Sequence, residues 1–115
     1  MAGEWSMVSG ARDGASLPKA FIQQGKRVVQ GTETTVAFGN QIFLKATFVV
    51  DTSKQPGAID YMVTRGADKG KTLYGIYAWD ADSIQFCFAA SGKDRPTEFT
   101  TQRGDGHTLS LWRRD

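Results

Sequence analysis

The sequence predicts an all-β fold: a small up-and-down antiparallel β-barrel of about eight strands with one short helix. Short segments that alternate apolar and polar side chains recur along the 115 residues, and Gly, Asn and Asp turn signals separate them. The connections are too short for the crossovers of a β-sandwich. An opening Gly3-Glu4-Trp5 and a closing Trp112-Arg113-Arg114 indicate that the two terminal strands pair, with a cation across an indole face. Residues 1–115 are therefore expected to form a single domain.

The first strand is expected over residues 5–11, where every second side chain shares a face, and Asp13-Gly14 ends it. Residues 16–25 break this alternation, because Pro18 suits the first turn of a helix and Gly25 can stop one. We expect one short helix or helical turn in this segment, lying across an open end of the barrel.

Three strands are expected next, over residues 26–30, 33–38 and 41–50. Thr and Val, which favour strands, dominate the second of them. Gly39-Asn40 is a strong signal for a tight turn before the third, whose outward face is mixed in character.

Five further strands are expected, over residues 58–65, 71–79, 84–89, 97–102 and 107–113. Clusters of Gly, Pro, Asp and Ser lie between them, as is typical of turns. The pair formed by the second and third of these strands is the clearest hairpin in the chain.

That hairpin gathers aromatic side chains on one face. Four residues would form this wall: Tyr77, Trp79, Phe86 and Phe88. Gly75 leaves a gap beside them, where a bend or a close approach can occur. The interior of an eight-stranded barrel is wide enough for side chains or for one small ligand, so the wall either fills the core or lines a pocket.

Composition excludes several classes of function. Fourteen basic and twelve acidic residues give a net charge of +2, which is too balanced to predict a nucleic-acid partner. Cys87 is the only cysteine and His107 the only histidine, so no intrachain disulfide, metal site or cofactor is expected. The chain shows no apolar run long enough for a membrane span and no signal peptide, so we expect a cytoplasmic protein without a membrane partner.

A few polar residues stand out from the strand pattern. Asp60 lies inside a strand with apolar neighbours, and Arg95 and Glu98 flank Pro96-Thr97. The structural interpretation is an Asp60–Arg95 ion pair that holds a loop to the barrel. The alternative is that Arg95 and Glu98 present polar groups to a ligand at the mouth. Cys87 alternates with the aromatic wall, so it is expected to be a packed residue on the opposite face.

The chain also resembles a known group. Gly3-Glu4-Trp5 is similar to the Gly-x-Trp opening of lipocalins, and the region from Pro56 onward resembles an uncharacterised lipocalin-like domain family of bacteria. The matching residues are Ala58-Ile59-Asp60, Lys69-Gly70-Lys71-Thr72-Leu73, Gly75-Ile76-Tyr77, Asp80, Asp82, Cys87, Arg95-Pro96-Thr97-Glu98-Phe99, Gly104 and Gly106. The resemblance implies a small lipocalin-like barrel and, because the family has no agreed activity, no catalytic residues.

Three functions are compatible with these observations. The favoured one is non-catalytic binding of a small, partly hydrophobic molecule, with the four aromatic residues lining the barrel and Arg95 and Glu98 at its rim. The first alternative is a packed barrel that acts as a structural or protein-interaction module, for example as a homodimer. The second is a small cofactor-independent enzyme that uses Asp60, His107 or Glu98 as acid or base.

Overall fold

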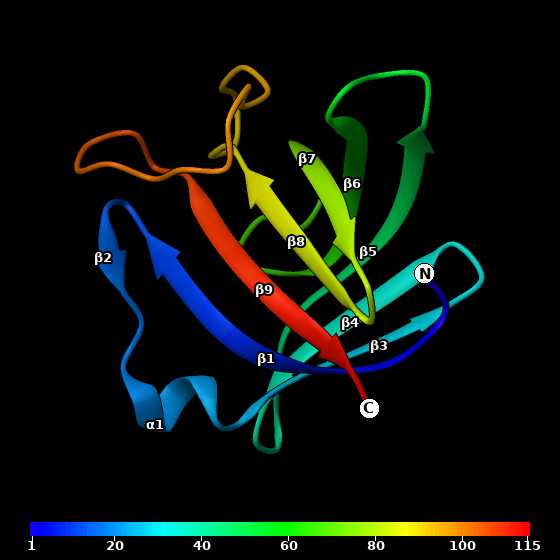
Figure 1. The fold of residues 1–115 in the computed structure, drawn as a ribbon, viewed down its shortest axis with the longest axis vertical. Coiled ribbons are helices and arrows are strands. Elements are labelled where there is room, and N and C mark those ends of the chain that lie inside the picture. The colour runs from blue at the N-terminus through cyan, green and yellow to red at the C-terminus, as the bar shows by residue number, and fades with distance from the viewer.

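The computed structural model describes residues 1–115 and shows a closed antiparallel β-barrel (Figure 1). The elements in chain order are β1 Gly3–Arg12, β2 Ala15–Ser16, α1 Lys19–Ile22, β3 Gly25–Gln30, β4 Glu33–Phe38, β5 Gln41–Asp51, β6 Gly57–Gly66, β7 Thr72–Asp80, β8 Ser83–Phe88 and β9 Thr108–Arg114. Each strand from β3 to β9 pairs with the next, β1 pairs with β3, and β1 also pairs with β9. This last pairing closes eight strands into a barrel, while β2 is an additional strand on the end of β1. The predicted fold class is confirmed.

The prediction of one strand is wrong. Residues 97–102 belong to an irregular loop that connects β8 to β9. Side chains in this loop bond to nearby backbone groups: the Asp105 carboxylate accepts from the N–H groups of Gln102 and His107. Such local hydrogen bonds compete with a strand ladder, and they explain why the alternation in this segment does not produce one.

The ends of β1 and β9 seal one end of the barrel with aromatic side chains. Trp5 pairs in register with Arg114 and is fully buried. The Arg114 guanidinium lies 4.2 Å from the centre of the Trp5 ring, so the expected cation over an indole face is present. Trp79 packs against Trp5, with the centres of the two rings 5.7 Å apart. Trp5 therefore closes this end, as its position in the sequence predicts.

The core follows the alternation of the strands. Ile59, Tyr61 and Val63 on β6 and the aromatic residues of β8 are all buried inside the barrel. Gly75 on β7 allows this packing, because a Cβ atom there would lie 2.6 Å from the Phe88 ring. The close approach expected at Gly75 is thus made by the Phe88 ring.

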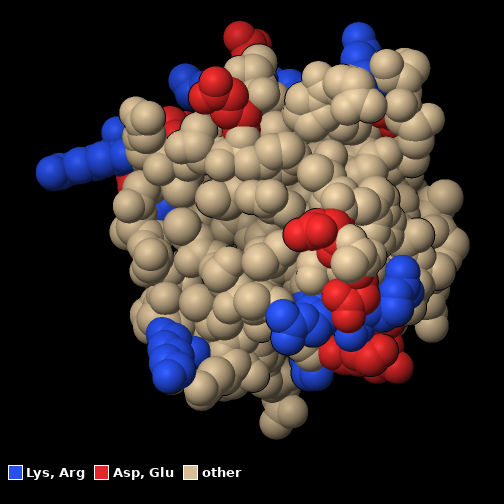
Figure 2. Space-filling model, viewed as in Figure 1, with Lys and Arg blue, Asp and Glu red and all other residues tan.

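Charged side chains are intermixed on the surface. On the face drawn in Figure 2, the largest group of charges contains both basic and acidic residues, in keeping with the net charge of +2. No helix of this protein has the length and apolar character needed to span a bilayer.

Candidate functional site: a cavity above a buried arginine

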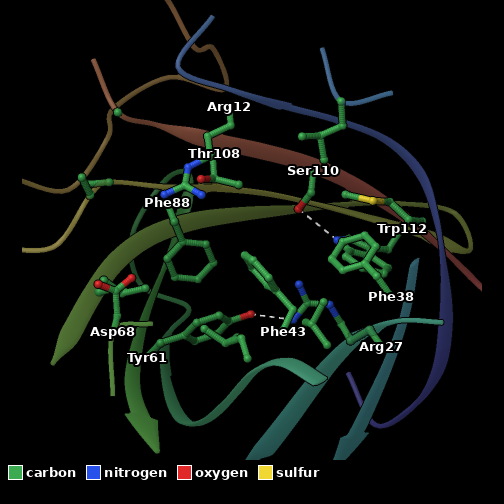
Figure 3. A pocket seen from close by; sticks show the side chains of 18 of the residues that line it. Arg12, Arg27, Phe38, Phe43, Tyr61, Asp68, Phe88, Thr108, Ser110 and Trp112 are labelled. Carbon is green, nitrogen blue, oxygen red and sulfur yellow. Dashed lines mark hydrogen bonds between the residues drawn. The ribbon is translucent and has the colours of Figure 1, made fainter. Parts of the chain in front are cut away.

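The barrel contains a cavity of about 220 Å³ (Figure 3). Nineteen residues line it, and thirteen of these are hydrophobic. Leu17 and Phe21 belong to the segment that contains α1, and both lie at the rim of the cavity. A short helix at an open end of the barrel was the expected arrangement. Phe21 packs on Phe38 of β4, with ring centres 3.9 Å apart. The cavity is therefore an apolar space whose rim is built by the α1 segment and the β4–β5 hairpin.

Arg27 is the charged group inside the barrel. On β3, residues at odd positions from Gly25 to Val29 are buried and those at even positions are exposed. Strict alternation therefore turns the Arg27 side chain inward, where only 5% of its surface is exposed. Its guanidinium borders the cavity and lies beside Tyr61 in Figure 3.

Hydrogen bonds satisfy only part of this guanidinium. Nη1 donates to Thr34 Oγ1 at 3.0 Å and to the Tyr61 hydroxyl at 2.6 Å. Nε is buried and has no hydrogen-bond partner in the protein. None of the four salt bridges of the structure involves Arg27, so the buried cation has no carboxylate counterion.

Two aromatic rings take the place of a counterion. The guanidinium carbon lies 4.5 Å from the centre of the Phe86 ring and 4.6 Å from that of Trp112. A desolvated cation gains about 2 kcal/mol from such a contact. The Trp112 indole N–H in turn donates to Ser110 Oγ at 2.9 Å, which fixes the ring. These contacts offset part of the large free-energy cost of burying a charge.

The other charged residues of the cavity lie at its edge. Arg12 is exposed, and Asp68 is half-buried on the opposite side of the cavity from Arg27 (Figure 3). The electrostatic character of the interior is therefore set by one unpaired cation, which favours a negatively charged group over a positive one.

The structure separates the aromatic residues of the predicted wall. Phe88 lines the cavity, whereas Phe86 lies against Arg27 without lining it. Tyr77 is buried beside Gly57, where a Cβ atom would lie 2.6 Å from its ring. Trp79 is half-exposed at the sealed end. Of the six predicted ligand-binding residues, Phe88 is the one that borders the cavity.

The two predicted polar residues lie outside the barrel interior. Arg95 forms the expected ion pair with Asp60 at 2.6 Å and also donates to the carbonyl oxygens of Ile59 and Gly75. It thereby fastens the β8–β9 loop to the barrel wall. Glu98 is exposed and does not line the cavity.

Sequence reasoning missed Arg27, although the sequence contains a signal for it. Lys26 and Arg27 stand together at the start of a strand whose later apolar residues include Val29. Because side chains in a strand alternate, the face that buries Val29 also buries Arg27. A basic residue that alternates in register with buried apolar residues is the pattern that indicates an inward-facing Arg27.

The β8–β9 loop borders the cavity through Ala89, Ala90 and Gly106. Asp13, in the turn before β2, holds this loop by accepting from the N–H groups of Gly104 and Gly106. The loop also covers Cys87, whose Sγ donates to the Thr100 carbonyl oxygen. Burial raises the pKa of the Cys87 thiol, so this residue is a packed apolar group on the outer face of β8, as expected.

Comparison of the chain with protein-family models, curated proteins and solved structures found no match. The class of protein is therefore defined by its fold and by its candidate site alone. It is a small closed antiparallel β-barrel whose interior holds an apolar cavity and a buried, uncompensated arginine.

Because Arg27 has no ion partner, its removal leaves no unpaired charge behind. We predict that Arg27→Met changes the free energy of unfolding by less than about 1 kcal/mol, since an apolar side chain of similar length replaces a desolvated ion. Tyr61→Phe removes an acceptor from the buried cation and is predicted to destabilise the barrel by about 1.5–3 kcal/mol. Urea unfolding of both variants measures whether Tyr61→Phe loses more stability than Arg27→Met. The cost of Tyr61→Phe is expected to shrink in the Arg27→Met background, and a large loss of stability in Arg27→Met itself would contradict the assignment.

The β8–β9 loop is predicted to make stability sensitive to acid. Partial desolvation opposes ionisation of Asp105, but hydrogen bonds from His107, Gln102 and Thr101 outweigh it and lower the pKa of this carboxyl. The stabilisation is therefore complete above the ordinary pKa of Asp, about 3.9, and is lost as the pH falls through the lowered value. The melting temperature of the wild type should exceed that of Asp105→Asn most at pH 7. The difference should decline below about pH 4, and a constant difference down to pH 2 would refute this role.

Proposed function

We propose that this protein binds a small, partly hydrophobic molecule inside its barrel without transforming it. The observation that carries the proposal is the cavity of about 220 Å³ with its thirteen hydrophobic lining residues. Small-molecule sites are concave and mostly apolar, with a few polar groups that orient the ligand. Arg27, Tyr61 and Ser110 are such polar groups here. The volume is small for a binding site and supports a compact ligand.

The interior space favours this function over the two alternatives. A fully packed structural module needs side chains throughout the barrel, and here a cavity of about 220 Å³ beside Arg27 is open. An enzyme needs an acid or base that faces its substrate. Asp60 is engaged by Arg95, His107 faces the Thr100 carbonyl oxygen, and neither they nor Glu98 lines the cavity.

We extend the proposal to family and location. The Gly3-Glu4-Trp5 opening, which places Trp5 under the Arg114 guanidinium, supports membership of the bacterial lipocalin-like group. We place the protein in the cytoplasm, a location with which the free, buried Cys87 is compatible.

Tryptophan fluorescence tests the proposed binding, because Trp112 lines the cavity. Titration with neutral and carboxylated apolar compounds of about six to ten non-hydrogen atoms should give a saturable change for at least one of them. Val36→Phe fills the cavity from β4 and should weaken that binding at least about tenfold. Trp79→Phe should leave the signal intact, because Trp79 lies at the sealed end of the barrel.

A matched control uses the same substitution outside the barrel. Val49 is 58% exposed on β5, so Val49→Phe should bind like the wild type. Binding that survives Val36→Phe in a folded protein, or the absence of a saturable change for every compound, would contradict the proposal.

A further inference from the structure

We propose that the ligand is a small apolar monocarboxylate whose carboxylate group binds Arg27 at the base of the cavity. This inference rests on the proposed binding function and adds the chemical class of the ligand. It follows from three features of the site: an unused edge of the guanidinium, an unbalanced charge and two hydroxyl groups with free hydrogens.

The unused edge is the first feature. Both hydrogen bonds of Arg27 leave from Nη1, so the edge formed by Nε and Nη2 makes none with the protein. Protein atoms cover Nε, whereas Nη2 is not among the covered nitrogens, so Nη2 is the donor that a ligand in the cavity can reach. A charged N–H donor forms a short, strong hydrogen bond with a carboxylate oxygen.

The unbalanced charge is the second feature. Arg27 is 5% exposed and has no ion partner, whereas the one acidic residue of the lining, Asp68, lies on the far side of the cavity (Figure 3). One negative charge neutralises the interior, and a second would be buried without a partner. The charge therefore selects a monoanion, and the apolar walls select a hydrocarbon body.

The hydroxyl groups are the third feature. The Tyr61 hydroxyl accepts from Arg27, and Ser110 Oγ accepts from the Trp112 indole, so each oxygen already uses an acceptor position. Their own hydrogens make no bond to the protein, and both residues line the cavity (Figure 3). Each hydroxyl group can donate a hydrogen bond to an anion, in addition to the bond from the charged Arg27 guanidinium.

Calorimetric titration with three compounds of equal chain length tests the inference. Octanoate, octan-1-ol and octyl sulfate share one tail and differ in the head group. At pH 7 we expect octanoate to bind about 10- to 100-fold more tightly than octan-1-ol, as charge-assisted hydrogen bonds require. Arg27→Met should bind octanoate no better than the alcohol. Arg27→Lys, which keeps the charge but loses the planar edge, should lose at least about fivefold in octanoate affinity and provides the test if Arg27→Met does not fold.

Arg113→Met is the matched control, because Arg113 is exposed on β9 next to the buried Trp112. It should change octanoate affinity less than about threefold. Equal binding of octanoate and octan-1-ol would overturn the carboxylate assignment while leaving the cavity as a binding site. Tighter binding of octyl sulfate than of octanoate would overturn it in favour of a tetrahedral oxyanion. Failure of all three compounds to bind would overturn both this inference and the proposed function.

Discussion

The pairing of β1 with β9 determines which side chains of this protein face a closed interior. It joins the two ends of the meander, and it brings Trp5 against Arg114 to seal one end of the barrel. A closed sheet has no free edge and encloses an interior. An open sheet with the same strands would expose the inner face of β3. Closure therefore turns Arg27 from a surface residue into a buried cation.

A buried cation without a counterion lowers the stability of the fold, and it leaves a positive charge available to an anionic ligand. Phe86, Trp112 and two hydroxyl groups hold the Arg27 guanidinium in place, but they leave its charge unneutralised. An apolar side chain at this position would fill the barrel at lower cost. The proposed anionic ligand would account for an arginine at this position. The adjacent cavity supplies the room, and its apolar walls strengthen any electrostatic contact made there.

The sequence predicts the scaffold better than the site, for physical reasons. Alternation and turn residues are local signals, and they correctly placed β4 and the hairpin of β7 and β8. They failed for residues 97–102, where Asp105 draws the backbone into local turns. The site depends on which inward-facing residues meet across the barrel and at what height. Tyr77 and Phe88 share a face of one hairpin, yet only Phe88 borders the cavity. Tyr77 pairs with Phe86, whereas Phe88 pairs with Gly75 at a greater distance from the hairpin turn.

The Nε–H resonance of Arg27 in a ¹H–¹⁵N NMR spectrum tests whether a carboxylate binds the buried guanidinium. This N–H is buried beside Nη2 and has no acceptor in the protein, so its chemical shift reports a change in what the guanidinium binds. The resonance is assigned by its loss in Arg27→Met. We predict that saturation with octanoate moves it downfield, while octan-1-ol leaves it within the range of small packing effects. An Arg27 Nε–H resonance that stays fixed when bound octanoate saturates the cavity would contradict the account.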